Sequence, residues 1–340
     1  MRYNAFPGRG TRFAAHNGKL VTLHRLDFIK LASAAGIVAL PGYAAAQDVK
    51  TVHVLAVPTD GVKSTLYAQK NNLFRKRGIN ADIVPMGSGA AIFAAVVGGS
   101  ADIGSGSLFP VFAAFGRGLP LRIIAPASLY TSDRADALMM VAKDSPFKTG
   151  RDLNGKTIGT DAIKDVYSTA TRAWVDQHGG DGASLRAIEL KPTEQIAALD
   201  SGRIDVCVLK SPFLQPAVDS GKFRILGKPL DAIGRRFLLS AWVANLDFIN
   251  KNRELVAAYA AALNEAAKIT NANQSLTTDL VAQFTGQEPS VLARGIRSVT
   301  AEALTLGDIQ RPIDFAVKYG IMEQRFEASA ILATGVPVSR

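Results

Sequence analysis

Residues 96–107 read VVGGSADIGSGS, and residues 199–211 read LDSGRIDVCVLKS. Each segment leads from the end of a helical pattern, through Gly-x-x-Asp, into a short β-strand pattern with serine at its end. The shared positions are Gly99 and Asp102 in the first segment and Gly202 and Asp205 in the second. Two α/β lobes of similar construction would produce this internal echo.

Short β-branched runs alternate with helical patterns around both segments. The predicted strands are 52–57, 81–85, 102–104, 121–125, 137–142, 157–159, 185–190, 204–209, 223–226 and 238–243. The predicted helices are 64–76, 90–97, 109–115, 165–178, 193–200 and 212–220, and residues 247–317 are helical in several pieces. Strand–helix–strand units of this length predict parallel sheets with right-handed crossovers.

The composition excludes several classes of protein. With 48% hydrophobic residues among 340, the chain is not disordered and is long enough for two domains. The formal net charge is +10, but residues 1–46 carry six of the basic residues and one acidic residue. The remaining 33 basic and 28 acidic residues are spread along the chain. This spread disfavours a nucleic-acid partner.

Cysteine and histidine are scarce. Cys207 is the only cysteine, so an intrachain disulfide and a cysteine-based zinc site are excluded. Of the four histidines, His16 and His24 lie in the basic leader, which leaves His53 and His178 far apart in the body. We therefore predict no catalytic residue, no metal and no cofactor, and we expect Cys207, between two valines, to be buried and inert.

The first 46 residues have the pattern of a cleavable signal peptide. Basic residues precede an apolar segment at 31–40, then a Pro-Gly break, then three alanines that end at Ala46. The apolar segment is shorter than the roughly twenty residues that a membrane span needs. We expect cleavage after Ala46 and a mature periplasmic protein. The absence of an arginine pair favours Sec over twin-arginine export, and the true start codon stays open.

A family resemblance follows from five quoted segments in this order: VPTDG (57–61), STLYAQKNNLFRKRGINADIVP (64–85), SGAAIFAAVVGGSADIG (88–104), DLNGKTIGT (152–160) and ALDSGRIDV (198–206). Together they resemble the solute-binding proteins of ABC importers, specifically the nitrate, sulfonate and thiamine-precursor group called SsuA/THI5-like. The resemblance covers roughly residues 50–270. It implies a two-lobed α/β fold of the periplasmic-binding-protein type II, with two crossing strands as hinge and a helical C-terminal region.

The resemblance, together with the order of the elements, predicts a discontinuous first lobe. The chain should cross between lobes near residues 138–145 and again near 236–243. Lobe one would then comprise residues 48–140 plus 242–340, and lobe two residues 141–241.

In open α/β sheets, ligands bind beyond the carboxyl ends of the strands, where helix N-termini favour anions. The ligand-binding candidates chosen on this basis are Thr59, Asp60, Ser88, Gly89, Ser105, Ser107, Ser128, Asp161, Ser168, Ser211 and Trp242. Some have a purely structural alternative. Ser88 is also a helix N-cap, Asp161 could bond a loop amide, and Trp242 could fill the core. Asp102 and Asp205 are interpreted as structural.

The resulting hypothesis is an extracytoplasmic binding protein that delivers a small anionic organic solute, sulfonate- or carboxylate-like, to an ABC permease in the inner membrane. We expect a monomer that binds a small-molecule ligand. The alternatives are a binding protein for a thiamine-pyrimidine precursor and a desulfinase-like enzyme on the same scaffold. Transport and sensing use the same clamp, so the sequence leaves both open.

Overall fold

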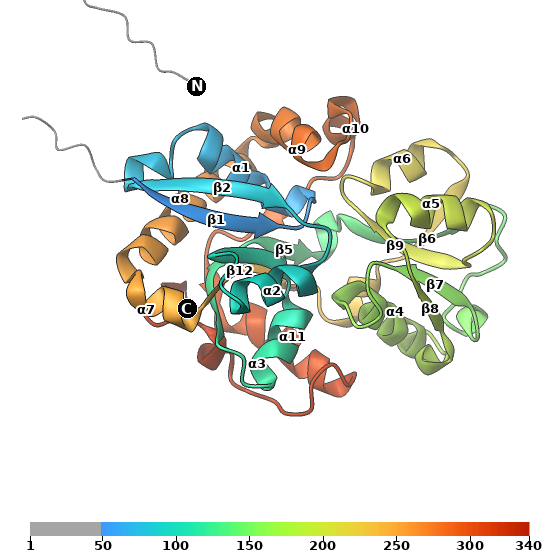
Figure 1. Ribbon diagram of the computed structural model, residues 1–340. Coiled ribbons are helices and arrows are strands. Elements are labelled where there is room, and N and C mark those ends of the chain that lie inside the picture. Colours follow the sequence, from blue (N-terminus) through green and yellow to red (C-terminus); the bar gives the residue numbers. More distant parts are fainter. Residues whose placement is uncertain (1–48, 340) are drawn as a thin grey trace, which may run out of the picture. The chain divides into compact units, whose positions relative to one another are not determined.

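The computed structural model describes residues 49–339, and the predicted signal peptide at 1–46 lies outside them (Figure 1). The described chain contains two five-stranded sheets. The first has the order β2-β1-β3-β12-β4. Its strands are β1 (Lys50–Ala56), β2 (Ile79–Pro85), β3 (Ile103–Ser107), β4 (Leu121–Pro126) and β12 (Ser240–Asn245). Strands β1, β2 and β3 are parallel, whereas β12 runs antiparallel to β3 and β4.

The second sheet has the order β10-β6-β9-β7-β8. Its strands are β6 (Ala137–Ala142), β7 (Thr157–Thr160), β8 (Arg186–Glu189), β9 (Val206–Lys210) and β10 (Phe223–Gly227). Strands β7, β8 and β9 are parallel, and β6 is antiparallel to β9 and β10. Each sheet therefore has a parallel half and an antiparallel half.

The chain passes between the two sheets twice, and the two connecting segments lie side by side as strands β5 and β11. Strand β5 (Ser128–Thr131) pairs antiparallel with β11 (Arg236–Leu238) and with β13 (Val299–Thr300). Strands β14 (Leu304–Thr305) and β15 (Val338–Ser339) form a separate pair. The first crossing from sheet to sheet thus falls between β4 and β6.

Eleven α-helices accompany the sheets in the described residues. Those between the strands are α1 (Lys63–Lys70), α2 (Gly89–Val97), α3 (Leu108–Gly116), α4 (Val166–Gln177), α5 (Pro192–Asp200) and α6 (Leu214–Asp219). The C-terminal ones are α7 (Leu246–Lys251), α8 (Arg253–Ala272), α9 (Thr278–Thr285), α10 (Pro289–Arg294) and α11 (Leu306–Lys318). None of the helices in residues 49–339 is both long and apolar enough to span a bilayer.

The two faces of the first sheet pack into different cores. On one face Val54, Ile124 and Trp242 join side chains of α1, α8 and α9. On the other face Ile123 and Val243 join side chains of α2, α3 and α11, in a core that continues around the second sheet. Figure 1 shows these helix groups on opposite sides of the sheet. Successive side chains along β4 and β12 therefore point into the two cores in turn, as in any strand that is buried on both faces.

The repeated Gly-x-x-Asp segments adopt the same local structure before β3 and before β9. Asp102 accepts a hydrogen bond from the backbone N–H of His53 at 2.8 Å, and its own N–H donates to the carbonyl of His53 at 3.0 Å. Asp205 makes the same pair of bonds with Thr157, at 2.8 and 2.9 Å. In both cases a glycine with positive φ, Gly99 at 76° and Gly202 at 71°, turns the chain after the preceding helix. Both aspartates are structural, as predicted.

The α/β class and the helical C-terminal region are confirmed, but four details were wrong. The sheets are mixed rather than parallel, because β12 and β6 run antiparallel to the strands beside them. Helix α1 ends at Lys70, not at 76, because Asn72 takes a positive φ of 59°. The strand β5 was missed, and residues 295–305 are not helical but contain the short strands β13 and β14. All of β6 lies in the second sheet, since Ala137 already pairs with Lys210. The lobe division remains a prediction, and this pairing favours a boundary before residue 137 rather than at 140.

Candidate functional site

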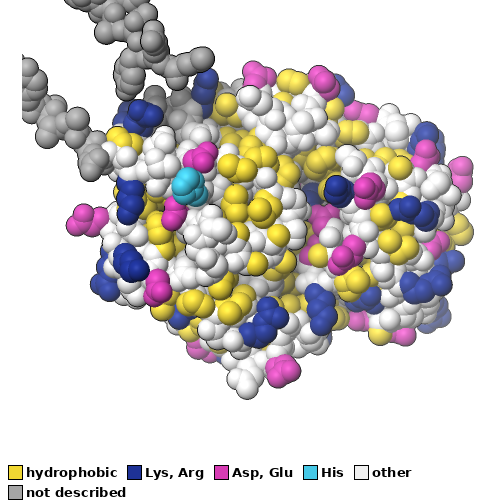
Figure 2. Space-filling model, viewed as in Figure 1, with side chains coloured by type: hydrophobic (Ala, Val, Ile, Leu, Met, Phe, Trp, Pro, Cys, Tyr) yellow, Lys and Arg dark blue, Asp and Glu magenta, His cyan; other side chains and the backbone are white. Residues whose placement is uncertain are grey.

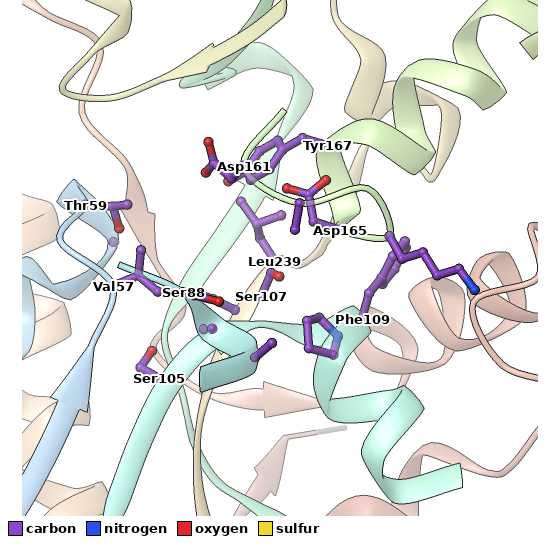
Figure 3. A pocket seen from close by; sticks show the side chains of 18 of the residues that line it. Val57, Thr59, Ser88, Ser105, Ser107, Phe109, Asp161, Asp165, Tyr167 and Leu239 are labelled. Carbon is purple, nitrogen blue, oxygen red and sulfur yellow. The ribbon is translucent and has the colours of Figure 1, made fainter. Parts of the chain in front are cut away.

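A cavity of about 600 Å³ is lined by loops at the carboxyl ends of strands from both sheets (Figure 3). Thr59, Ser88, Ser105 and Ser107 line it from the first sheet, and we call these residues the hydroxyl wall. Asp161, Asp165, Tyr167 and Lys210 line it from the second sheet, and we call these the charged wall. In Figure 3 the labelled members of the two walls lie on different sides of the cavity. The position agrees with the general rule for ligands of open α/β sheets.

The hydroxyl wall owes its placement to strand ends and helix starts. Ser105 and Ser107 lie on β3, while Ser88 and Ser107 occupy the N-cap positions of α2 and α3. Neither N-cap serine makes a side-chain capping bond. Within residues 49–339, none of the four hydroxyls hydrogen-bonds another group of the protein. These hydroxyls are therefore free to bond a ligand.

Backbone groups add to the hydroxyl wall. Gly89 is the first residue of α2, and the N–H groups of a first helical turn have no partner within the helix. Gly106 on β3 allows the start of α2 to approach, since a Cβ on Gly106 would lie 3.1 Å from the Cα of Gly89 and 2.9 Å from the ring of Phe93. The helix dipole and the free N–H groups together favour a negatively charged group at this position.

Ser128 and Ser240 form a bonded pair at the same cavity. The backbone N–H of Ser128 donates to the Ser240 hydroxyl at 3.0 Å, and the two hydroxyls bond each other. Both residues line the cavity. Because they belong to β5 and β12, they tie the first crossing segment to the first sheet.

The charged wall is held together by its own bonds. The ammonium of Lys210 forms an ion pair with Asp161 Oδ2 and lies 4.5 Å from the centre of the Tyr167 ring. Gln195 donates to Asp161 Oδ1 at 2.8 Å. Burial lowers the pKa of Lys210, but the Asp161 carboxylate, together with Tyr167 and Asp165, outweighs burial and raises that pKa above its usual value. Lys210 therefore stays charged.

Asp165 is the N-cap of α4 and is only 7% exposed. Its Oδ1 accepts the N–H of Ser168 at 2.7 Å. Burial, and then the nearby Asp161 carboxylate, raise the pKa of Asp165 to about 6. The side chain is thus mostly ionised at neutral pH, although its surroundings disfavour the charge.

Seven of the eleven predicted site residues line the cavity: Thr59, Ser88, Gly89, Ser105, Ser107, Ser128 and Asp161. The other four do not. Ser168 is fully buried, and its hydroxyl donates to the carbonyl of Ile163 at 2.7 Å, which closes the loop before α4. Ser211 lies one residue beyond the cavity-lining Lys210, and its N–H donates to the carbonyl of Asp136 at 2.9 Å.

Asp60 and Trp242 are also placed away from the cavity. Asp60 is fully buried and binds Arg297 through Oδ1, with a shortest distance of 2.6 Å, while Oδ2 accepts the N–H of Ser298. Trp242 is 1% exposed and packs edge-on against Tyr259 at 5.9 Å between ring centres. The first forms a structural ion pair and the second fills the core.

Lys210, Asp165 and Tyr167 line the cavity but were not among the eleven predicted ligand-binding residues. The similarity between residues 96–107 and 199–211 could have identified Lys210. Aligning Gly99 with Gly202 and Asp102 with Asp205 also aligns Ser107 with Lys210, so the two residues end equivalent strands. Asp165 had been assigned only to the start of a helix, and nothing local to Tyr167 separates it from a core aromatic.

Cys207 is fully buried in β9, and burial raises the pKa of its thiol to about 12. A thiol in this state supplies almost no thiolate, the form that acts as nucleophile. Among residues 49–339 there is also no cluster of three or more His, Cys, Asp or Glu side chains suited to a metal ion.

Figure 2 shows that uncharged and charged side chains gather over different regions on one face of the molecule. Hydrophobic side chains gather over β2 and α2, whereas basic and acidic side chains are mixed over the region of α4 and α5. The surroundings of the hydroxyl wall are therefore apolar, and those of the charged wall are rich in both signs of charge.

Two known proteins are similar to this chain in sequence. The chain is 26% identical over 273 residues to a putative aliphatic sulfonates-binding protein of Escherichia coli, covering 78% of this chain and 82% of that one. It is also 26% identical to the taurine-binding periplasmic protein of Escherichia coli, over 66% and 68% of the two chains. Both relatives are binding proteins.

Solved structures agree on the fold. The periplasmic aliphatic sulphonate-binding protein SsuA of Escherichia coli superimposes with a TM-score of 0.69 at 20% identity, covering 84% of this chain and 92% of that one. The desulfurization enzyme DszB has the same fold, with a TM-score of 0.63 at 16% identity over 84% and 97% of the two chains. At these identities the likeness shows the fold alone.

The sequence profile described as NMT1/THI5 like matches residues 62–275, which is more than half of the chain. The matched range includes strands of both sheets and every member of the two walls except Thr59. The chain belongs to the NMT1/THI5-like family.

Proposed function

We propose that this protein binds a small organic oxyanion, sulfonate- or carboxylate-like, between its two sheets and delivers it to an ABC importer. The observation that carries the proposal is the hydroxyl wall: four hydroxyls that have no partner in the described part of the chain line one cavity together with the start of α2. Neutral hydroxyls and backbone N–H groups bind sulfonate or carboxylate oxygens without requiring a buried cation at that wall. The aliphatic sulfonate- and taurine-binding relatives support this ligand class.

The location and partners follow from the same reasoning. The signal-peptide pattern at 1–46 and the periplasmic relative support export into the periplasm. There the protein acts as a monomer, with the two lobes closing on the ligand and an inner-membrane permease receiving it. Affinity would come from contacts that form with both walls only in the closed state.

Two other functions are less well supported. A desulfinase-like enzyme on this scaffold would need a reactive nucleophile, whereas Cys207 is buried and its pKa is raised. A thiamine-pyrimidine precursor would be bound by aromatic stacking, but in the described residues the aromatic side chains that line the cavity are Phe109 and Tyr167 alone, and Trp242 lies in the core. We therefore propose binding without chemical conversion.

A thermal-shift screen tests the proposal directly. Mature protein is heated with alkanesulfonates, nitrate, aromatic carboxylates and a pyrimidine precursor in separate wells. A ligand present at a hundred times its Kd adds about 2.7 kcal/mol to the free energy of unfolding. We expect a stabilising shift with alkanesulfonates or carboxylates and none with the pyrimidine. Stabilisation by the pyrimidine alone, or chemical conversion of any ligand, would reject the proposal.

A further inference from the structure

One contact between the two sides of the molecule lies outside the cavity and is built around Ser298. On the side of the first sheet, its backbone N–H donates to Asp60 Oδ2 at 2.6 Å and its carbonyl accepts from the ammonium of Lys63. Its hydroxyl donates to Asp136, the residue that directly precedes β6 of the second sheet. All four residues are buried. Ser298 therefore bonds both sides of the molecule at once.

Helices α6 and α10 continue this contact to the surface (Figure 1). Leu214 of α6 packs in the core that surrounds the second sheet, whereas Leu292 of α10 packs in the core that contains α1 and α8. Between the two helices, the guanidinium of Arg294 donates to Asp219 Oδ2 at 3.0 Å, and both side chains are exposed. This ion pair is a second bond between the two sides.

The contact lies behind the walls of the cavity. In the loop after β1, Thr59 and Gly61 line the cavity, whereas the carboxylate of Asp60 between them bonds the buried contact. After β9, Lys210 lines the cavity, whereas the next residue, Ser211, donates its N–H to the chain at the start of β6. The cavity and the contact therefore lie on opposite sides of the same two loops.

The segments that connect the sheets lie beside both features. Residues of β5 and of the segment after β11 line the cavity, and β13, which begins directly after Ser298, pairs with β5. A rotation about these segments that narrows the cavity draws apart the groups on their other side. The bonds of Ser298 with Asp136 and of Arg294 with Asp219, which we call the rear contact, then lengthen or break.

We propose that the rear contact sets the ligand affinity by stabilising the open form. A ligand that closes the cavity has to break the rear contact, so each of its bonds weakens ligand binding without touching the ligand. This inference rests on the closing of the lobes that is part of the proposed function. It goes beyond that function by assigning a regulatory role to residues outside the cavity.

Charge reversal tests the exposed part of the rear contact. Arg294→Asp and Asp219→Arg each replace attraction by repulsion, and the double variant restores a pair of opposite charges. In calorimetry with propane-1-sulfonate, each single variant should bind about two- to fivefold more tightly than the wild type, and the double variant should bind like the wild type. The two single changes alter the net charge in opposite directions. A common direction therefore cannot come from their long-range field on an anionic ligand.

The matched control is Arg77→Asp. It makes the same charge change in an exposed ion pair, with Glu265 at 2.7 Å, that lies wholly on the side of the first sheet. Its affinity for propane-1-sulfonate should equal that of the wild type.

A wedge between α6 and α10 tests the inference without a ligand. A Cβ on Gly295 would lie 3.3 Å from the Cβ of Gln215, and the φ of Gly295 is −78°, which other residues adopt readily. Gly295→Leu should therefore push α6 away and favour the closed form. Small-angle scattering of the ligand-free protein should give a smaller radius of gyration than in the wild type. Gly307→Leu is the control, because a Cβ there meets no atom within 4 Å.

The outcomes are distinguishable. Unchanged or weaker binding of propane-1-sulfonate by the single variants would overturn the role of the rear contact and leave the proposed function standing. The same follows if Arg77→Asp binds as tightly as they do. If propane-1-sulfonate does not bind the wild type, the sulfonate function fails and the scattering experiment alone decides the inference. A radius of gyration in Gly295→Leu that equals or exceeds that of the wild type would overturn it.

Discussion

The two halves of the molecule share a frame but differ at the cavity. In both, a glycine with positive φ and an aspartate bonded to a neighbouring strand begin the strand that reaches the site. That strand ends in Ser107 in the first sheet and in Lys210 in the second. One wall consequently presents hydroxyls without partners, and the other presents charges that mostly satisfy one another. The glycine and aspartate that the two halves share, which we call the shared frame, fix the positions of β3 and β9. The last residue of each strand then determines what its wall can bind.

The largest expected effect comes from breaking the charged wall. Lys210→Met removes the cation and leaves the carboxylates of Asp161 and Asp165 close together without compensation. Asp161 is exposed, so the cost comes mainly from the buried Asp165, which loses the nearby cation; a buried charge that loses its counter-charge costs about 3 kcal/mol of unfolding free energy. The matched control is Lys222→Met, which breaks the exposed pair with Asp200 and should cost less than about 1 kcal/mol. Urea denaturation measures both, and equal stability of the two variants would refute the distinction.

The next effect has the opposite sign. The pKa of Asp165 is raised in the folded state, so the folded protein binds this proton more tightly than the unfolded chain does. Ionised Asp165 therefore lowers stability as pH rises from about 4 to about 6. At pH 7.5, Asp165→Asn should be more stable than the ligand-free wild type by about 3 kcal/mol. The gain should vanish below pH 4, and denaturation at both values checks it. A destabilised variant at pH 7.5 would show that the charge supports the fold.

A smaller effect tests the shared frame. Asp102→Ala and Asp205→Ala each remove the bond to a neighbouring strand's backbone N–H, and each should cost about 1 kcal/mol. Ligand affinity should stay unchanged in both variants, because neither residue lines the cavity. Paired denaturation and calorimetry measure the two properties. Unequal costs, or a change in affinity, would mean that the two halves are not equivalent in this respect.

The sequence predicted features that depend on local pattern. Strand and helix alternation, the structural role of Asp102 and Asp205, and the serines at strand ends all follow from residues close together in the chain. Failures arose where the deciding partner is distant. Asp60 was predicted to bind the ligand because it follows a strand. Its carboxylate instead forms a buried ion pair with Arg297, which lies 237 positions away in the sequence.

Two other errors have different physical origins. Helix α1 was extended by six residues because the apolar spacing continues past Asn72, whereas the positive φ at that asparagine ends the helix. Ser211 was chosen as the serine that ends the second segment, although Lys210 is the residue in the cavity. Placing Lys210 correctly required exact alignment of the two halves rather than a match of residue types.

The central claim is that the hydroxyl wall binds the oxyanion, and calorimetry on the Ser105→Ala/Ser107→Ala double variant tests it most directly. The ligand is the sulfonate that stabilises the wild type most, and Ser201→Ala, an exposed serine at the end of α5, is the control. Each lost bond should weaken binding by about 0.5–1.5 kcal/mol, or up to about 3 where the acceptor is charged. Unfolding free energy should change by less than about 0.5 kcal/mol. A double variant that binds as tightly as the control would contradict the placement of the site.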